Sequence, residues 1–230
     1  MRKFSIVGLH GKEAKSAIKA AIKGGFALSK KPDFAIVIGG HGTVYFAEKK
    51  LPSVPKLLIR PENIRDIPRA IKNISSGKFK IREIRKLKMS VNGKSLEAMN
   101  DVVVRNTGLE HAIRFVIKYG NKKKFVVADG VVVSTTYGST GYFRSVCRKN
   151  FKGGYGLAFN NSIENIPPFF FSRGRILVRI KRGIAEATAD SSNKVISIGK
   201  GDSVYITPSK KSVKLIDING IDLFRRRAFP

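Results

Sequence analysis

Apolar runs alternate with segments of helical spacing over residues 1–75, and this alternation constrains the fold more than any other feature of the sequence. The apolar runs lack alternating polar positions, as is typical of parallel strands that are covered on both faces. A strand–helix alternation of this kind predicts an α/β domain, which we place at residues 1–77. The expected strands are residues 4–8, 34–38 and 56–59, and the expected helices are residues 13–23 and 62–73.

The pattern changes after Ser75-Ser76-Gly77, where short β-like runs separated by turn residues replace the alternation. Tyr119-Gly120-Asn121-Lys122 is a plausible hairpin turn between two of these runs. We therefore expect a second, β-rich domain at residues 78–230, with closing residues that can pack back on the first domain. The expected strands are residues 79–91, 112–119, 125–134, 175–180, 195–198, 203–206 and 213–216.

Composition limits the class of protein and its partners. Of the 230 residues, 42% are hydrophobic, which is enough for a real core, and no stretch approaches the ~18 apolar residues of a membrane span. The N-terminus runs into a strand-like segment without a signal-peptide pattern, and the single cysteine excludes an internal disulfide. We expect a cytoplasmic protein without a membrane partner.

The net charge of +29 predicts an anionic partner such as nucleic acid, polyphosphate or a phosphorylated metabolite. The basic residues are nevertheless spread along the whole chain, so a solvated basic surface also explains them. The sequence contains no motif that reads RNA or DNA, and a nucleic-acid partner is therefore not favoured.

A glycine-rich turn, Gly39-Gly40-His41-Gly42-Thr43, follows the second expected strand. It falls at the carboxyl end of a parallel strand, the edge at which open α/β sheets bind ligands. Glycines there allow backbone N–H groups to approach phosphate oxygens. The turn is neither a Walker A loop nor a GxGxxG fingerprint, so a structural tight turn is an equally good interpretation of this stretch alone.

A longer stretch, Ala128 to Tyr142, delivers a strand into five hydroxyl-bearing residues, two glycines and two tyrosines. Such a turn offers hydroxyl and N–H groups to an anionic or ribose-bearing ligand, although its serines are also suitable helix caps. Upstream, Asn100-Asp101 precedes an apolar run, and an amide beside a carboxylate can hold vicinal ribose hydroxyls. A helix end or a turn explains that pair equally well.

The three motifs together resemble the NAD kinase family. GGHGT, AMNDVVV and DGVVVSTTYGSTGY stand in the order and at about the separations of GGDGT, ALNE/ALND and GDGxxxSTPTGSTAY in that family. The likeness extends to the closing segment, residues 189–216, and covers most of the chain, which is similar to a compact, archaeal-type member. The resemblance implies an α/β N-terminal domain, a β-rich dinucleotide-binding C-terminal domain, a nucleotide cleft between them, and a homodimer or homotetramer.

The resemblance also implies an activity: transfer of a phosphoryl group from ATP or inorganic polyphosphate to the 2′-hydroxyl of the adenosine ribose of NAD, giving NADP. Mg2+ or another divalent metal would assist. His41 stands at the position of the family's catalytic aspartate, and Asn100 and Asp101 would hold the substrate ribose. The residues expected to face phosphate are Gly39, Gly40, Gly42 and Thr43, and those expected to line the dinucleotide pocket are Asp129, Gly130, Ser134, Thr135, Thr140, Gly141 and Tyr142.

Departures from the family pattern concentrate on the phosphoryl-transfer side. An imidazole at position 41 can accept a proton near neutral pH, but it is a poor ligand for Mg2+, which prefers oxygen. Metal positioning would then fall to phosphates or to another carboxylate such as Asp101 or Asp129. Residues 56–63 replace the family's Gly-Asn-x-Gly segment. A catalytically weak or inactive NAD(P)-binding paralogue with a sensing or regulatory role therefore remains the alternative.

Overall fold

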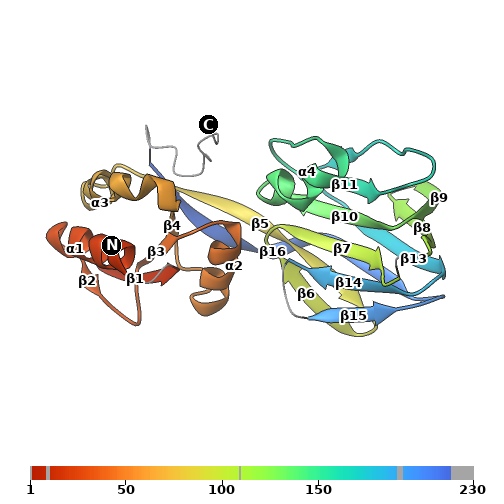
Figure 1. The fold of residues 1–230 in the computed structure, drawn as a ribbon, viewed down its shortest axis with the longest axis horizontal. Coiled ribbons are helices and arrows are strands. Elements are labelled where there is room, and N and C mark those ends of the chain that lie inside the picture. Colours follow the sequence, from red (N-terminus) through yellow and green to blue (C-terminus); the bar gives the residue numbers. More distant parts are fainter. Residues whose placement is uncertain (1, 9–10, 109, 191–193, 219–230) are drawn as a thin grey trace. The chain divides into compact units, whose positions relative to one another are not determined.

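The structure is a computed structural model that describes residues 2–8, 11–108, 110–190 and 194–218, with the backbone but not the side chain of His41. It contains two compact units (Figure 1). Unit 1 is Met1–Glu83 with Val213–Pro230, and unit 2 is Ile84–Ser212. The chain leaves unit 1 within strand β5 (Lys80–Val91) and returns to it within β16 (Ser203–Asp217).

Unit 1 is built on a parallel sheet in which β3 is central and entirely buried. The ends of its strands are in register, since Gly8 pairs with Ile38 and Ile38 pairs with Ile59. The carboxyl ends of three strands therefore lie at one edge of the sheet. The strand order is β2 (Ala27–Leu28), β1 (Lys3–Gly8), β3 (Phe34–Ile38), β4 (Lys56–Ile59) and the end of β16.

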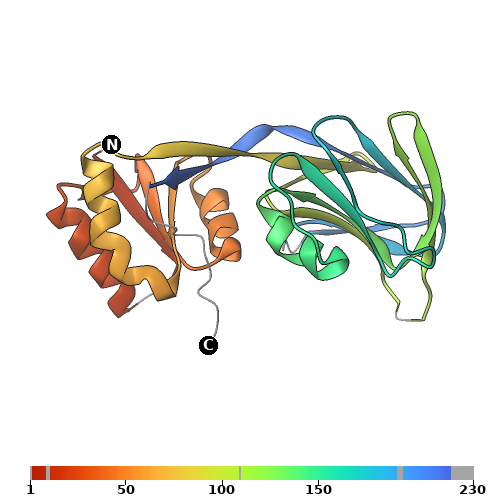
Figure 2. The same cartoon turned by 90° about the horizontal axis from the view of Figure 1, so that it is seen from above.

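Helices cover both faces of this sheet, which explains the lack of polar alternation in its strands. Figure 2 shows α1 (Lys12–Lys23) and α3 (Ile67–Ser75) on one face and α2 (His41–Lys50) on the other. The first face is closed by a cluster that includes Phe34 from the sheet and Ile71 from α3, both at most 2% exposed. Apolar burial on both faces makes unit 1 an α/β domain, as the sequence predicts.

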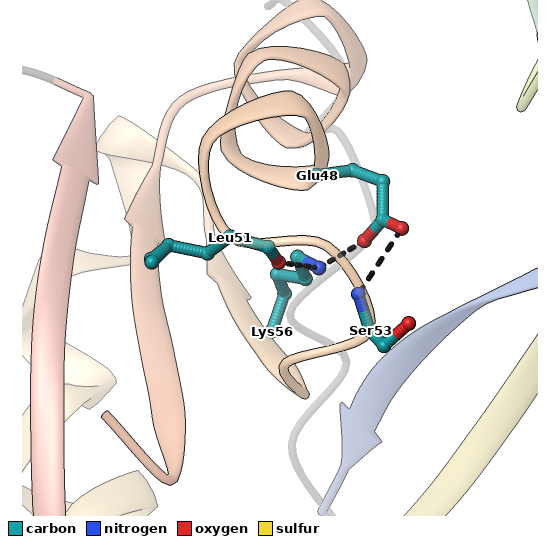
Figure 3. Close-up of polar contacts among 4 residues, drawn as sticks. All are labelled: Glu48, Leu51, Ser53 and Lys56. Atoms are coloured by element: carbon teal, nitrogen blue, oxygen red, sulfur yellow. Dashed lines mark hydrogen bonds and ion pairs between the residues drawn. The ribbon is translucent and has the colours of Figure 1, made fainter. Parts of the chain in front are cut away.

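A buried ion pair ties α2 to the start of β4 (Figure 3). Lys56 is fully buried and Glu48 is 6% exposed. The Lys56 ammonium donates to the Glu48 carboxylate and to the carbonyl oxygen of Leu51 at 2.8 Å, and the Ser53 N–H donates to the same carboxylate at 3.3 Å. Each charge therefore has several polar partners, which is the condition under which burying an ion pair is tolerated.

Unit 2 consists of two β-sheets. The first has the order β12 (Phe169–Phe171), β11 (Tyr155–Asn160), β10 (Gly130–Thr135), β7 (Asp101–Asn106), β14 (Ala185–Ala189) and β15 (Val195–Ile198), and its strands are antiparallel. The second runs from β16 through β13 (Ile176–Arg182) and β8 (Ile113–Tyr119) to β9 (Lys122–Ala128), with β5 and β6 (Lys94–Ala98) paired beside it.

The two sheets of unit 2 share one apolar cluster, to which Val104 and Leu157 contribute from the first sheet and Phe115 and Val178 from the second. Helix α4 (Tyr142–Cys147) packs on the outer side of the first sheet, where Phe143 contacts Val132 and Ala158. The β-rich character predicted for this part of the chain is confirmed, and so is the hairpin between β8 and β9. Among the described residues, every helix is too short or too polar to cross a bilayer.

Several boundaries differ from the expected ones. The helix expected at residues 62–73 is a 3-10 helix, η1 (Pro61–Asp66), followed by α3, because Pro68 lacks an N–H and suits the first turn of a new helix. Asp129 divides the strand expected at residues 125–134 into β9 and β10. The strands expected at 203–206 and 213–216 are both parts of β16.

The units also divide elsewhere than after residue 77. The first residues of β5 belong to unit 1, where Arg82 forms an ion pair with Asp217 at 3.0 Å. The chain from Val213 belongs to unit 1 as well, because Leu215 of β16 pairs with Lys56 of β4. The closing strand therefore completes the parallel sheet, and the β-rich unit ends at Ser212.

Candidate functional site

The glycine-rich turn of unit 1 joins the carboxyl end of β3 to the first turn of α2. The Gly39 N–H donates to the carbonyl oxygen of Ile59 at 2.9 Å, which fixes the turn to the end of β4. The Gly40 N–H donates to Oγ1 of Thr43 at 3.3 Å, and the Gly40 carbonyl accepts from Thr43 and Val44. Further N–H groups of this first turn have no partner within the helix and are available to an anion.

Two glycines are required for this turn to form. Gly39 has φ +151°, and a Cβ there would lie 2.2 Å from Oγ1 of Thr43. At the end of β1, a Cβ on Gly8 would lie 2.1 Å from the carbonyl oxygen of Ile38. Gly42, in contrast, has nothing within 4 Å of the corresponding position. The turn is therefore closed on the sheet side and open beside Gly42.

His41 is the first residue of α2. Its side chain lies outside the described part of the structure, so its predicted role as the proton acceptor stays a prediction. Gly39, Gly40, Gly42 and Thr43 form this turn, and their contacts with phosphate stay a prediction.

The Asn100-Asp101 pair of unit 2 sits in a turn held by a third residue, Asp190, which follows β14. The Asp190 carboxylate accepts the backbone N–H groups of Met99, Asn100 and Asp101 at 2.7, 2.6 and 3.1 Å. Three N–H groups directed at one carboxylate form an anion-binding nest within the protein itself. The turn before β7 is thereby fixed in one conformation.

Hydroxyl groups from the end of β10 hold the same turn through its carbonyl groups. Oγ1 of Thr135 donates to the Met99 carbonyl oxygen at 2.6 Å, and Oγ of Ser134 donates to the Asn100 carbonyl oxygen at 3.3 Å. The Thr135 N–H also donates to the Asn100 carbonyl at 2.8 Å. Ser134 and Thr135 are fully buried, so they support the Asn100-Asp101 turn and do not form an exposed pocket wall.

Two oxygen atoms of this turn are buried without a partner in the described structure. They are Oδ1 of Asn100 and Oδ1 of Asp101. Buried polar atoms are normally hydrogen-bonded, so unsatisfied acceptors on adjacent residues indicate a ligand that carries donors. The vicinal hydroxyls of a ribose supply two such donors on adjacent atoms.

The proton affinity of Asp101 is shifted by its surroundings. Burial raises the pKa of the Asp101 carboxyl to about 7, the Ser134 hydroxyl opposes this change, and the negative charge of Asp190 adds to it. Burial also raises the pKa of Asp190, against the lowering effect of its three backbone N–H donors. Asp101 therefore changes its charge near neutral pH, a property concentrated at functional sites.

Asp129 and Gly130 are not brought together with this turn. On the antiparallel ladder of β7 and β10, Asp101 pairs with Ser134 while Gly130 pairs with Arg105, about 13 Å away at a rise of ~3.3 Å per residue. The Asp129 carboxylate accepts from the side-chain amides of Asn106 at 3.4 Å and Asn161 at 2.8 Å. These hydrogen bonds connect Asp129 to the last residue of β7 and to the residue that follows β11.

The remaining predicted residues follow β10. Thr140 and Gly141 line a shallow pocket of about 330 Å³ together with Arg144, Ser145 and Arg148. Tyr142 begins α4 and is partly buried against Phe143 and its neighbours. The pocket is polar and basic, which suits an anionic group.

Sequence reasoning assigned no role to two residues that the structure places at these turns. Asp190 ends an alternating strand and begins a turn-rich segment, so its position indicates a capping carboxylate but not which turn it caps. Arg60 directly follows the buried strand β4, and a Cβ on Gly40 would lie 3.5 Å from its Nη1 atom. A cation directly after the apolar residues 57–59 is the available signal in the sequence.

Comparison with known proteins gives consistent results at the level of sequence and of fold. The chain is 30% identical to an NAD kinase of Treponema denticola over 218 residues, covering 82% of this chain and 74% of that protein. It is 27% identical to an NAD kinase of Clostridium beijerinckii over 221 residues, covering 84% and 76%. No protein-family model matches the chain.

Two solved structures share the fold. An NAD kinase from Archaeoglobus fulgidus in complex with ATP superposes with a TM-score of 0.78 at 19% identity, covering 98% of this chain and 96% of that one. A yeast NADH kinase complexed with NADH gives a TM-score of 0.81 at 13% identity, covering 94% and 83%. The two-unit architecture is therefore one that has been observed in other proteins.

Proposed function

The chain belongs to the NAD kinase family, and from this premise we propose that it phosphorylates the 2′-hydroxyl of the adenosine ribose of NAD to give NADP, with ATP as the phosphoryl donor. The observation that carries the proposal is the pair of buried, unsatisfied oxygens on Asn100 and Asp101. They are acceptors on a turn that Asp190 holds rigid. A ribose carrying two adjacent hydroxyl groups satisfies both of them.

We assign the acceptor nucleotide to unit 2. The Asn100-Asp101 turn would hold the ribose, and the basic pocket at Thr140, Gly141 and Arg144 suits an anionic part of the dinucleotide. Ser134 and Thr135 contribute by keeping the turn in place. The assignment leaves out Asp129, which precedes β10, and Gly130, which begins it, because this end of β10 is remote from Asp101.

We assign the donor phosphates to unit 1. The turn at residues 39–43 offers free N–H groups at the first turn of α2, and Gly42 leaves its open side unobstructed. His41 would accept the proton of the 2′-hydroxyl, an assignment based on its position in the sequence. A neutral imidazole can accept such a proton, so the residue type at position 41 suits that role.

A divalent metal fits the residues of unit 1 poorly, because residues 39–43 include no carboxylate. Among the described residues, no group of three or more acidic, histidine or cysteine side chains is arranged to hold a metal. The oxygens of Asn100 and Asp101 in unit 2 are of the type that Mg2+ prefers, and a metal held there would supply positive charge.

The test is NADP formation by the purified protein with NAD, Mg2+ and either ATP or polyphosphate, beside His41→Ala and His41→Asp. We expect turnover in the wild type and a loss of ~10²- to 10⁴-fold in His41→Ala, the usual contribution of a general base. Equal rates in wild type and His41→Ala would remove His41 from the chemistry. No turnover in the wild type, with NAD bound and activity gained in His41→Asp, would identify an NAD-binding relative that lost the reaction.

We further propose that the protein forms a homo-oligomer in the cytoplasm. Phe170 is 48% exposed and packs against the buried Phe143 and the partly buried Phe151, so this aromatic cluster of unit 2 reaches the surface at Phe170. Large exposed aromatic surfaces mark association sites. Light scattering after size exclusion checks this, and a monomeric mass at micromolar concentration would contradict it.

A further inference from the structure

The register of the parallel sheet places Arg60 beside the glycine-rich turn at residues 39–43. It is the first residue after β4, and Ile59 at the end of that strand pairs with Ile38 at the end of β3. The hydrogen bond from the Gly39 N–H to the Ile59 carbonyl, 2.9 Å long, joins the two strand ends. Arg60 therefore leaves the sheet directly beside the glycine-rich turn.

The guanidinium of Arg60 lies against Gly40, and its Nε atom lacks an acceptor among the described residues. A Cβ on Gly40 would be 3.5 Å from the Nη1 atom, so the glycine leaves room for the planar group. The Nε atom is buried and has no hydrogen-bond partner among the described residues, and Arg60 forms no ion pair with them. An arginine that serves solubility extends its donors into water, so a buried, unsatisfied N–H indicates a missing anion.

The chemistry of the turn agrees with an anion. Residues 39–43 carry no carboxylate that could neutralise the guanidinium. The first turn of α2, a helix of ten residues, adds unpaired N–H groups and the positive end of the helix dipole. Arginine binds phosphate through two parallel hydrogen bonds, a geometry that a point charge such as lysine cannot reproduce.

We propose that Arg60 is a phosphate-binding residue of this turn and contacts a terminal phosphate of the phosphoryl donor. The identity of the donor rests on the proposed function, whereas the phosphate site rests on unit 1 alone. A fixed guanidinium supplies positive charge to the donor phosphates at a turn that has no carboxylate to hold a metal. The chain thus carries at position 60 a cation whose geometry suits a phosphate group of the donor.

The first test measures binding of inorganic tripolyphosphate and of ATP by calorimetry, without NAD, at 150 mM salt so that the general positive field is screened. Loss of a charge-assisted bidentate contact in Arg60→Gln should weaken binding of both ligands by about 10- to 100-fold. Arg60→Lys should recover only part of the lost affinity, because lysine keeps the positive charge but cannot form the two parallel hydrogen bonds of a guanidinium. Wild-type affinity in Arg60→Gln would overturn the proposal.

Arg2→Gln is the matched control. Arg2 is exposed and directly precedes β1, at the end of the sheet opposite to Arg60, and its loss changes the net charge equally. Its tripolyphosphate affinity should equal that of the wild type. An equal fall in both variants would overturn the proposal by assigning the effect to the overall charge. Urea unfolding checks that Arg60→Gln is folded. If Arg60→Gln is unstable, the tripolyphosphate affinity of the wild type is compared with that of a folded Arg60→Lys variant.

A failure of this inference can be told from a failure of the proposed function. If the wild type forms NADP, Arg60→Gln should raise the KM for ATP and leave the KM for NAD unchanged. If the wild type forms no NADP but Arg60→Gln still weakens tripolyphosphate binding, the kinase assignment fails and the phosphate site stands. If NADP forms and the KM for ATP is the same in both proteins, the role of Arg60 is refuted while the kinase assignment stands.

Discussion

Asp190 accepts a hydrogen bond of 2.6 Å from the backbone N–H of Asn100, ninety positions earlier in the chain. The same carboxylate accepts the N–H groups on either side of that bond. One side chain from the end of β14 thus determines the conformation of the turn before β7. Asp190 therefore orients the Asn100 and Asp101 side chains by holding their backbone, and it need not contact the ligand itself.

Substitution of Asp190 should therefore impair NAD binding and stability together. Asp190→Ala leaves three buried N–H groups without an acceptor, and we expect a loss of about 3 kcal/mol or more in the free energy of unfolding. NAD affinity should fall at least tenfold, whereas Asp190→Asn retains an acceptor oxygen and should lose less. Urea unfolding and calorimetry measure the two effects.

Asp202 provides a control for Asp190, because its carboxylate also accepts a backbone N–H, that of Gly199 at 2.8 Å, in a different turn of unit 2. Asp202→Asn should reduce stability slightly and leave NAD affinity unchanged. If Asp190→Ala binds NAD as tightly as Asp202→Asn does, the rigid turn has no part in recognition.

The stability of the protein should fall as Asp101 ionises. Its pKa of about 7 in the folded protein exceeds the ordinary value of 3.8, so the folded state holds the proton more tightly than the unfolded state does. The resulting stabilisation is complete below about pH 4 and is lost as pH rises to about 7, and it amounts to about 4 kcal/mol. Urea unfolding from pH 4 to 8 should show a much smaller decline in Asp101→Asn, and identical declines would contradict the shift.

NAD affinity should change with pH in the opposite direction. The ionised Asp101 carboxylate is the stronger acceptor for a ribose hydroxyl, so binding should tighten as pH rises from 6 to 8. Calorimetric titration of NAD at several pH values measures this dependence. An affinity that falls over the same range would mean that the protonated carboxyl is the form that binds.

The local features of the fold follow from the sequence, and the long-range ones do not. Phe34–Ile38 and Lys56–Ile59 have the bounds predicted for them, because a short apolar run between turn residues has few alternative conformations. The sequence allows the closing residues to pack back on the first domain, but the pairing of Leu215 with Lys56 is decided by tertiary packing and not by a local pattern.

The candidate site shows the same division. The motif residues Gly39 and Asn100 can be found from their spacing and from the resemblance to a family. Asp190 and Arg60 act through bonds and contacts made across distant segments, which no local pattern encodes. The separation of Asp129 from the Asn100-Asp101 turn is also topological, because Asp129 precedes β10, whose first residue pairs with Arg105 at the other end of β7.

The buried Glu48–Lys56 pair should respond asymmetrically to substitution. Lys56→Met alone leaves a carboxylate that is 6% exposed without its ammonium partner, and we expect a loss of about 3–5 kcal/mol in the free energy of unfolding. The double variant Glu48→Leu with Lys56→Met removes both charges and should be close to the wild type in stability. Chemical denaturation compares the variants, and a double variant as unstable as the single one would show that the loss arises from packing.

Gly39→Ala should disrupt the glycine-rich turn at residues 39–43, whereas Gly42→Ala should leave the structure of this turn unchanged. A methyl group on Gly39 would lie 2.2 Å from Oγ1 of Thr43, and the residue would have to keep φ +151°, so the turn must open or the hydrogen bond to Gly40 must break. We expect tripolyphosphate affinity to fall at least tenfold and the free energy of unfolding to fall by about 1–3 kcal/mol. Gly42 has nothing within 4 Å of the added methyl, so its alanine variant should keep wild-type stability. If Gly39→Ala and Gly42→Ala lose phosphate affinity equally while both stay folded, close approach of the ligand, and not the shape of the turn, is what these glycines provide.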